Sequence, residues 1–381
     1  MATQGHIRRR GKGWVVVVDI GKDEEGRRRQ RWHSGYRTSR EAKAALVEIL
    51  GRVQRGDYVE PSKLTVAEFM RDWLGSLRAT LRPSTIAGYE ALTQGHIIPM
   101  LGSMTLQKLT AVQVTAFYGD LLEKGRRNGK GGLSARTVHY IHATMHKALG
   151  EAVRWGLVVR NVADQASPPH PQAKEMRTWS ATELRDFLSH VQGDRLYAAF
   201  LLAATTGLRR GEVLGLRWRD LDFDARRLAV TQTLVCVGYA VVVSAPKTAS
   251  GKRSVALDAA TVAALRTYRK RILEERLYQG LGAPSPDDLV FTAIDSSPLH
   301  PGQFADHFDR LVKASGVPRI RFHDLRHTHA TLALQAGVHP KVVSERLGHA
   351  SISITLDTYS HAIPALQEEA AAKVAALVFG A

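Results

Sequence analysis

The sequence predicts a multidomain protein with three units. They are a small β-sheet plus a helix, an all-α unit, and a larger mixed, mainly α unit with a small β-sheet. Three observations predict this organisation. The 381 residues exceed the usual size of one domain. Segment 167–171 holds three prolines in five residues, which favours an extended boundary. Strand-like runs of β-branched residues are confined to residues 14–36 and 228–257, whereas helical periodicity dominates elsewhere.

The first predicted unit spans residues 1–60. Residues 14–20 and 27–36 have the composition of two strands, and the glycines at 21 and 26 favour a turn between them. Thr38 and Glu41 have the spacing of a capping box, which predicts a helix that runs to about Arg55.

This unit is strongly basic. Up to Arg37 it contains ten Lys or Arg residues against four acidic residues. Such a surface is often only solvated, but the aromatic residues Trp14, Trp32 and Tyr36 lie among the cations. A cationic β-ribbon of this kind fits a groove of DNA.

The second predicted unit spans residues 64–166 and is helical throughout. Thr65 with Glu68, and Thr110 with Gln113, have capping-box spacing, and Ser134 is placed to cap a long helix to about Trp155. Pro99 is expected to end the second helix of this unit. Histidines recur along the long helix without accompanying Cys or carboxylate residues, so we interpret them as polar positions rather than metal ligands: His139, His142 and His146.

A linker is expected over residues 167–178, and residues 179–381 form the third unit, which ends in a helix over 364–379. Ser180 with Glu183 predicts its first helix. The uncharged run 228–246 approaches the length of a membrane span. It is rich in Val and broken by Gly238 and Tyr239, so we expect a buried hairpin and no membrane segment.

Charge and composition limit the functional classes. The net charge of +17 and the pI near 10.1 indicate a polyanionic partner, nucleic acid before membrane. The single cysteine, Cys236, excludes an internal disulfide framework and a Cys-based zinc ribbon. No apolar segment follows the basic N-terminus, so we expect a cytoplasmic protein without a secretory signal.

Four motifs in the third unit carry residues suited to chemistry. The segment Thr-Gly-Leu-Arg-Arg-Gly-Glu over 206–212 follows an apolar helix, and its glycine can end that helix and present Arg209. Residues 246–252 resemble a hairpin tip that projects Lys247 or Lys252. His-Asp-Leu-Arg-His over 323–327 lies at a predicted helix start, and Leu-Gly-His over 347–349 precedes Tyr359 by ten residues.

Each motif has an ordinary alternative. Arg209 alone suggests an ion pair, Lys247 alone a solvated cation, and Tyr359 alone a packing aromatic. His323 and His327 have zinc-ligand spacing, but Asp324 stands where a zinc protease needs Glu. Together the motifs suit phosphodiester chemistry. Arginines can hold the phosphate, a lysine can protonate a leaving oxygen, histidines can handle protons, and a tyrosine can attack phosphorus.

The ordered motifs resemble the signature of the tyrosine recombinases, the phage-integrase family, over about residues 175–365. The resemblance fills six catalytic positions: Arg209, Lys247, His323, Arg326, His349 and Tyr359. It implies that Tyr359 attacks the scissile phosphate and forms a 3′-phosphotyrosyl link with a free 5′-hydroxyl. It further implies that Arg209 and Arg326 hold the phosphate.

The resemblance also assigns roles to the remaining polar residues. Lys247, preferred over Lys252, protonates the leaving oxygen. His323 assists proton transfer at Tyr359, and His349 hydrogen-bonds the phosphate. Glu212 and His327 support the catalytic residues without contacting the phosphate.

The resemblance implies an arm-type DNA-binding domain over residues 1–60, a SAM-like core-binding domain over 64–166 and a catalytic domain over 179–381. The expected activity is site-specific integration, and excision with a helper, of a phage or mobile element. No metal, cofactor or ATP is implied. The expected partners are double-stranded DNA with core and arm attachment sites, three further copies in a homotetramer on DNA, and an excisionase or host DNA-bending protein as helper. The resemblance implies that the C-terminal helix docks on the neighbouring protomer; the alternative is that it packs on its own domain.

Three alternatives stay open at this point. A resolvase or transposon-type recombinase would share the chemistry and differ in biology. A DNA-binding regulator would carry the same motifs without activity. A metal-dependent nuclease would need clustered carboxylates, whereas only isolated acidic residues flank the motifs.

Overall fold

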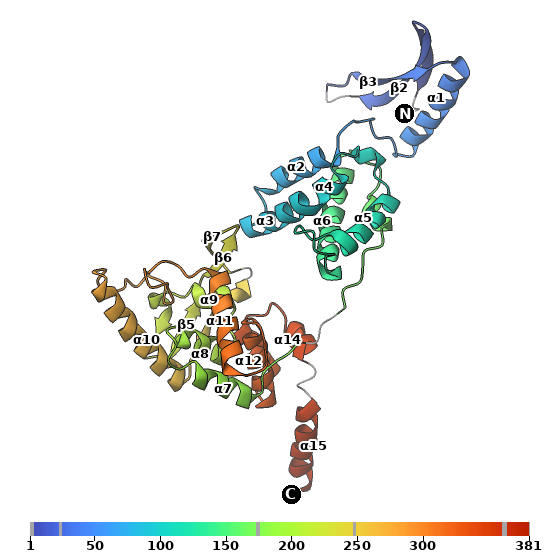
Figure 1. Ribbon diagram of the computed structural model, residues 1–381. Helices are drawn as coiled ribbons and strands as arrows, with labels where there is room; N and C mark the ends of the chain where they lie inside the picture. Colours follow the sequence, from blue (N-terminus) through green and yellow to red (C-terminus); the bar gives the residue numbers. More distant parts are fainter. Residues whose placement is uncertain (1–3, 23–24, 173–175, 247–248, 360–363, 381) are drawn as a thin grey trace. The chain divides into compact units, whose positions relative to one another are not determined.

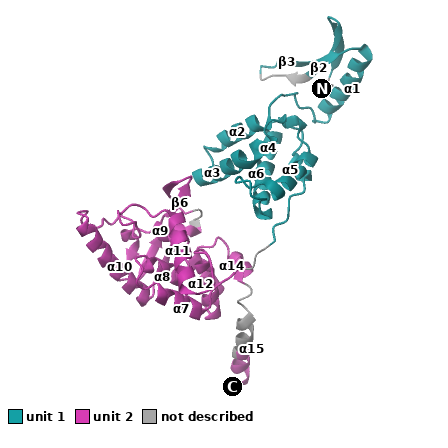
Figure 2. Ribbon diagram, viewed as in Figure 1, with its two compact units in different colours: residues 1–173 teal, residues 174–381 magenta. Residues whose placement is uncertain are grey.

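The computed structural model describes residues 4–22, 25–172, 176–246, 249–359 and 364–380. The chain divides into two compact units, residues 1–173 and 174–381 (Figure 2). The boundary falls inside the expected linker. The finer division of the first unit into residues 1–60 and 64–166 stays a prediction.

The chain begins with a three-stranded antiparallel sheet and one helix (Figure 1). The strands are β1 (Gly5–Arg10), β2 (Gly13–Lys22) and β3 (Arg28–Tyr36), with β2 in the centre, and the helix is α1 (Ser39–Gln54). The Thr38 side chain caps α1 by accepting from the Glu41 backbone N–H. On the helix side, Val16 and Val18 are fully buried with Ala42.

Strand β1 is a departure from the sequence prediction, which placed no strand before Trp14. Its sequence, Gly-His-Ile-Arg-Arg-Arg, has only one large apolar residue, so alternation along it cannot be recognised. The strand forms because β2 offers a full row of hydrogen-bonding partners, with Ile7 opposite Val16. Pairing with an apolar neighbour therefore outweighs the weak local preference.

Helices follow to the end of the first unit, as predicted. The unit contains α2 (Val66–Leu77), α3 (Pro83–Leu92), η1 (Thr93–Ile97), α4 (Ile98–Leu101), η2 (Leu106–Lys108), α5 (Ala111–Lys124), α6 (Ala135–Arg154) and η3 (Val162–Gln165). The capping boxes of α2 and α5 and the Ser134 cap of α6 are confirmed. These helices bury one core that includes Phe69, Trp73, Phe117 and Ile141.

Pro99 does not end a helix, and that prediction is wrong. The chain passes from α3 through the π-helical turn η1 into α4, where Pro99 occupies the first turn. In the π-turn the Ile98 N–H donates to the Thr93 carbonyl five residues back. Because a proline in a first helical turn has no N–H to satisfy, the new turn accommodates it.

The second unit is mainly helical. It contains α7 (Ala181–His190), α8 (Tyr197–Thr206), α9 (Arg210–Leu214), η4 (Trp218–Asp220), β4 (Leu221–Asp222), β5 (Arg227–Val230), β6 (Thr233–Val237), β7 (Ala240–Ser244), η5 (Ala249–Gly251), β8 (Arg253–Ala256), α10 (Ala259–Tyr278), α11 (Pro301–Ser315), α12 (Asp324–Gln335), α13 (Pro340–Leu347), α14 (Ile352–Tyr359) and α15 (Pro364–Phe379). The capping box at Ser180 and Glu183 is confirmed. The predicted fold class is thus confirmed in all three of its architectures.

The core of this unit places the functional motifs. Aromatic residues of α7, α8 and α11, including Phe187, Phe200 and Phe308, form its centre. A smaller apolar cluster joins α12, α13 and α14, and Tyr359 lies fully buried in it with Leu334 and Leu347. The tyrosine is therefore held by packing rather than displayed on a free surface.

The predicted buried hairpin is wrong in part. Strands β6 and β7 do form a hairpin with Gly238 at the turn, but it is a separate two-stranded sheet. Tyr239 at its tip is 99% exposed, and Val243 is also exposed. Strands β5 and β8 instead pair with each other beside β4. Strands β7 and β8 thus belong to different sheets, and the predicted hairpin tip at 246–252 includes residues 247 and 248, which lie outside the described residues.

No helix within the described ranges is long and apolar enough to cross a membrane. The uncharged run 228–246 consists of β-strands and their connections. Exposed valines in β7 reflect a hairpin with few neighbours on one face.

Candidate active site

Arg209 is placed by a tight helix-to-helix turn. Helix α8 ends at Gly207, which adopts a left-handed conformation with φ of 67°. A Cβ at Gly207 would lie 2.5 Å from Leu347 Cδ2, so glycine also permits the close approach of α13. Arg209 is then the N-cap of α9, and its backbone N–H and Nη1 both donate to the Glu212 carboxylate at 2.9 Å.

Arg326 projects from the first turn of α12 into the interior. Its side chain is 3% exposed, and Nη1 donates to the Gly207 carbonyl at 2.8 Å. Nη2 is buried and finds no hydrogen-bond partner among the described residues. Burial and the neighbouring charge of Arg209 lower the pKa of Arg326 to about 9. A buried cation with an unused donor can accommodate an anionic ligand.

Tyr359, the last residue of α14, contacts His327 of α12. The phenol oxygen lies 2.8 Å from Nδ1 of His327. Burial raises the pKa of Tyr359 to about 12, although the nearby Arg326 opposes the rise. Burial and the adjacent His323 lower the pKa of His327 to about 4. The pair is therefore a neutral phenol beside a neutral imidazole at pH 7.

The two histidines of the His-Asp-Leu-Arg-His motif lie differently around Tyr359. The sequence predicted proton transfer at Tyr359 by His323, with His327 in support. In the structure His327 is the hydrogen-bond partner, and His323 meets the His327 ring edge-on with centroids 5.2 Å apart. His323 is the N-cap of α12, and His327 lies one turn further along the helix.

His349 follows the left-handed Gly348 that ends α13. Its Nδ1 lies 2.8 Å from Oγ1 of Thr355, a fully buried residue of α14. Burial and the charges of Arg326 and Arg209 lower the pKa of His349 to about 4. The charge of Arg209 acts on His349, His323 and Arg326 alike, so these side chains belong to one electrostatic cluster.

Lys247 lies outside the described residues. The alternative Lys252 is described and exposed. Glu212 is buried and accepts from both Arg209 and Arg253. Burial alone would raise the pKa of Glu212, but the hydrogen bonds and charges of the two arginines lower it, so the carboxylate stays ionised.

Two residues of this cluster were missed by sequence reasoning. Arg253 reaches Glu212 from β8, and no spacing in the sequence connects them. Thr355 could have been found, because it lies four residues before Tyr359 and so shares one face of the same helix.

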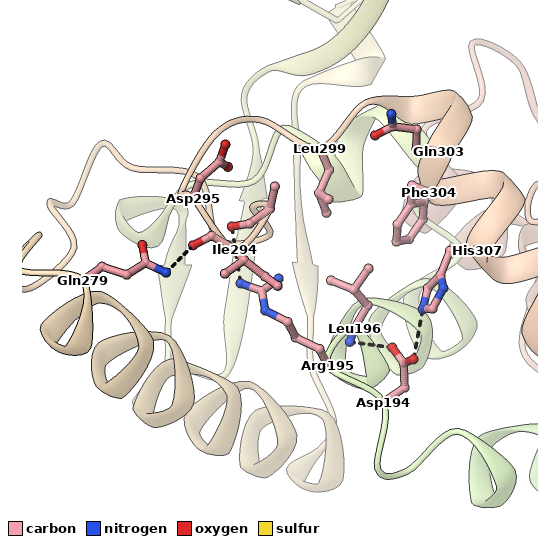
Figure 3. Close-up of a pocket in the computed structure, with 11 residues that line it drawn as sticks. Asp194, Arg195, Leu196, Gln279, Ile294, Asp295, Leu299, Gln303, Phe304 and His307 are labelled. Atoms are coloured by element: carbon pink, nitrogen blue, oxygen red, sulfur yellow. Dashed lines mark hydrogen bonds and ion pairs between the residues drawn. The ribbon is translucent and has the colours of Figure 1, made fainter.

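One pocket of the second unit lies apart from these residues (Figure 3). It has a volume of about 700 Å³ and contains none of the predicted catalytic residues. Leu196, Leu299 and Phe304 make it apolar, and Asp194 at its rim pairs with His307 at 2.9 Å. Among the described residues no group of three or more His, Cys, Asp or Glu side chains is arranged to hold a metal ion.

The arrangement can hold a phosphodiester. Two arginines supply positive charge, one of them with an unused buried donor, and a phenol with an adjacent proton acceptor supplies a nucleophile.

Family profiles cover most of the chain. The phage integrase family matches residues 176–365, an arm DNA-binding domain matches 6–53, and the N-terminal SAM-like domain of phage integrases matches 65–122.

Full-length relatives agree. A tyrosine recombinase XerC-like protein of Caldanaerobacter subterraneus is 30% identical, with 96% of each chain covered. The ICEBs1 integrase of Bacillus subtilis is 26% identical, covering 95% of this chain and 96% of the relative. The chain therefore belongs to the tyrosine recombinase (phage integrase) family, and it is a site-specific recombinase that cleaves and rejoins DNA.

Solved structures share the fold. The Tn1549 transposon integrase, in complex with transposon right end DNA, superposes with a TM-score of 0.67 and 25% identity over 80% of this chain and 98% of that chain. A lambda integrase tetramer bound to a Holliday junction gives a TM-score of 0.56 at 20% identity, covering 91% and 95% of the two chains. The second likeness concerns the fold alone.

Proposed function

We propose that this chain integrates a phage or other mobile element, and with a helper excises it, by using Tyr359 to cleave and rejoin attachment-site DNA. The observation that carries the proposal is the buried Arg326 Nη2, which has no described partner and belongs to the same charged cluster as Arg209 and Tyr359. A nonbridging oxygen of the scissile phosphate would complete its hydrogen bonding.

The chemistry is a balanced transesterification. The Tyr359 oxygen bonds to phosphorus as the 5′-oxygen leaves, which gives a 3′-phosphotyrosyl link and a free 5′-hydroxyl. The phenol proton passes to His327, and Lys247 returns a proton to the leaving oxygen. Attack by the 5′-hydroxyl of the partner duplex reverses the step, so no ATP is consumed.

The remaining site residues stabilise charge. Arg209 and Arg326 hold the phosphate and the charge that develops on it. His349 presents Nε2 to the phosphate, since Nδ1 is engaged with Thr355. His323 lies against His327 and helps to keep it neutral.

The N-terminal sheet, residues 1–60, reads arm-type DNA. The face of the sheet away from α1 carries Arg8 opposite Val15, and His6 and Trp32 opposite Val17. The guanidinium of Arg10 lies 5.9 Å from the centre of the Trp32 ring, and both side chains are exposed. Cations held beside an aromatic ring on an open sheet face suit a DNA groove. Deleting residues 1–60 should abolish arm-site binding and leave core-site cleavage; unchanged arm-site binding would contradict this role.

Residues 64–166 bind the core site together with the catalytic domain, residues 179–381, and residues 167–178 link them. Four protomers assemble on DNA, with α15 docking on a neighbour. The exposed Val374, Leu377 and Phe379 of α15 support such docking. We place the protein at the nucleoid in the bacterial cytoplasm, with an excisionase or host DNA-bending protein as helper.

Mapping the covalent link tests this proposal. The protein is incubated with duplex DNA from around its own gene, the complex is trapped with SDS, and the DNA is digested. Mass spectrometry should find the residual nucleotide on the peptide that contains Tyr359. A nucleotide on any other residue, or cleavage without a protein link, would refute the proposal.

A further inference from the structure

Arg253, the first residue of β8, uses its guanidinium to join three separate segments. Its side chain is 7% exposed. Nε donates to the Arg346 carbonyl at 2.6 Å, and Nη1 donates to the Gly251 carbonyl at 3.2 Å. Nη1 and Nη2 also bind the two carboxylate oxygens of Glu212, at 3.2 and 2.9 Å. A buried fork with this many acceptors is held in one orientation.

The Glu212 carboxylate, which Arg253 holds in place, in turn fixes the position of Arg209. It is 5% exposed and lies between the two arginines. Its oxygens also accept from the backbone N–H and from Nη1 of Arg209. A carboxylate that already has two arginine partners cannot rotate without breaking both sets of bonds. Arg209, whose side chain is 40% exposed, therefore takes its direction from a rigid group behind it.

Arg253 also sets the end of α13. A Cβ on Gly348 would lie 2.9 Å from Nη1 of Arg253, so the guanidinium packs directly against this corner. The Gly348 carbonyl in turn accepts from Arg209 Nη2 at 3.4 Å, and His349 is the next residue. One buried side chain thus touches the supports of two proposed phosphate-binding residues.

We infer that Arg253 is a positioning residue: it acts through Glu212 to direct Arg209 at the scissile phosphate. The inference rests on the proposed function, because it takes Arg209 as a phosphate ligand. The neighbouring Lys252 is exposed.

A double-mutant cycle on the full chain tests the inference. The variants are Arg253→Met, Arg209→Ala and the pair of them. The readouts are the single-turnover rate of covalent-complex formation on a nicked duplex carrying the mapped core site, and the Kd for the same intact duplex. Arg253→Met should slow cleavage about 10- to 100-fold, the range expected for small misplacement of a catalytic group. Its Kd should change by less than about threefold, because the phosphate backbone supplies most of the affinity.

Measuring Arg253→Met with and without Arg209 distinguishes a positioning effect from a general loss of folding stability. In the Arg209→Ala background, Arg253→Met should cost less than about threefold, because the group that it positions is gone. Arg253→Lys keeps the charge without the fork and should recover part of the rate. If Arg253→Met does not fold, the same cycle is run with Arg253→Lys, and a smaller loss that again vanishes with Arg209→Ala supports the inference.

Arg346→Met is the matched control. The Arg346 side chain donates to the backbone carbonyls of Ala256 and Thr205, near the same corner. Its loss should lower the melting temperature and act equally with Arg209 present or absent. Equal losses for Arg253→Met in both backgrounds would overturn the inference. A normal cleavage rate for Arg209→Ala alone would instead overturn the proposed role of Arg209, so the two failures are distinguishable.

Discussion

Replacing His327 by Leu should both slow strand cleavage and change its pH dependence. In the wild type, the phenol oxygen of Tyr359 lies 2.8 Å from His327 Nδ1, and the pKa of His327 is about 4. The imidazole is therefore a neutral proton acceptor at pH 7. Because a base must be unprotonated to act, the cleavage rate should be flat between about pH 5 and 8 and fall as the pH drops through 4. Above that plateau it should also fall, as the pH approaches the pKa of about 9 of Arg326.

The magnitude follows from the buried phenol. A pKa raised from 10 to about 12 makes ionisation about 3 kcal/mol harder than in water. Only about one phenol in 10⁵ is ionised at pH 7 with such a pKa. Without His327 the reaction depends on this fraction or on water. The rate should fall by about 10²- to 10⁴-fold and then rise with pH, about tenfold per unit.

The assay is single-turnover formation of the covalent complex between pH 4 and 9, with His323→Leu as the matched variant. His323 lies against His327 but is not the hydrogen-bond partner of Tyr359, so its variant should keep the flat profile. A rising profile for His323→Leu, together with a flat one for His327→Leu, would refute the reasoning and restore the assignment made from sequence.

Three further predictions concern stability and binding. Gly211→Ala places a Cβ 2.3 Å from Thr233 Oγ1 and 2.4 Å from the Leu234 carbonyl, so it should lower the free energy of unfolding by about 1–3 kcal/mol despite the better helix propensity of alanine; an unchanged urea midpoint would contradict this. Burial lowers the pKa of His329 to about 4. As the pH falls from 6.5 to 4, this histidine is therefore protonated in the unfolded chain but stays neutral in the folded chain. The free energy of unfolding should fall in that window by up to about 3 kcal/mol. His329→Gln should reduce this acid loss in urea unfolding, and an identical pH dependence would exclude the contribution. Affinity for core-site DNA should fall steeply with added salt, because many phosphates are contacted; a flat response in a binding titration would argue against this.

Local signals in the sequence predicted much of the fold. Capping boxes such as Thr65 with Glu68 and Ser180 with Glu183 form hydrogen bonds within four residues. They therefore allow helix starts to be predicted from the local sequence alone. Strand β1 is stabilised mainly by pairing with β2, and its basic sequence has no apolar alternation from which a strand could be predicted. The π-turn before Pro99 is a conformation that local propensities do not encode.

Part of the candidate active site could also be predicted from local sequence signals. Arg209 and His349 stand just after the left-handed glycines that end α8 and α13, and such glycines are local signals. The partner of Tyr359 and the role of Arg253 depend on contacts between segments far apart in the chain. Tertiary packing creates such contacts, and no local pattern in the sequence predicts which distant residues will meet.

The proposed mechanism requires that Tyr359 itself becomes linked to DNA. Wild-type protein and Tyr359→Phe are incubated in EDTA with duplex DNA from around the gene, stopped with SDS, and examined for protein-linked DNA. Phenylalanine keeps the buried ring and removes only the nucleophilic oxygen, so both proteins should bind DNA with similar affinity. We expect a covalent adduct with the wild type alone. An adduct with Tyr359→Phe, or none with a wild type that recombines the same DNA, would contradict it.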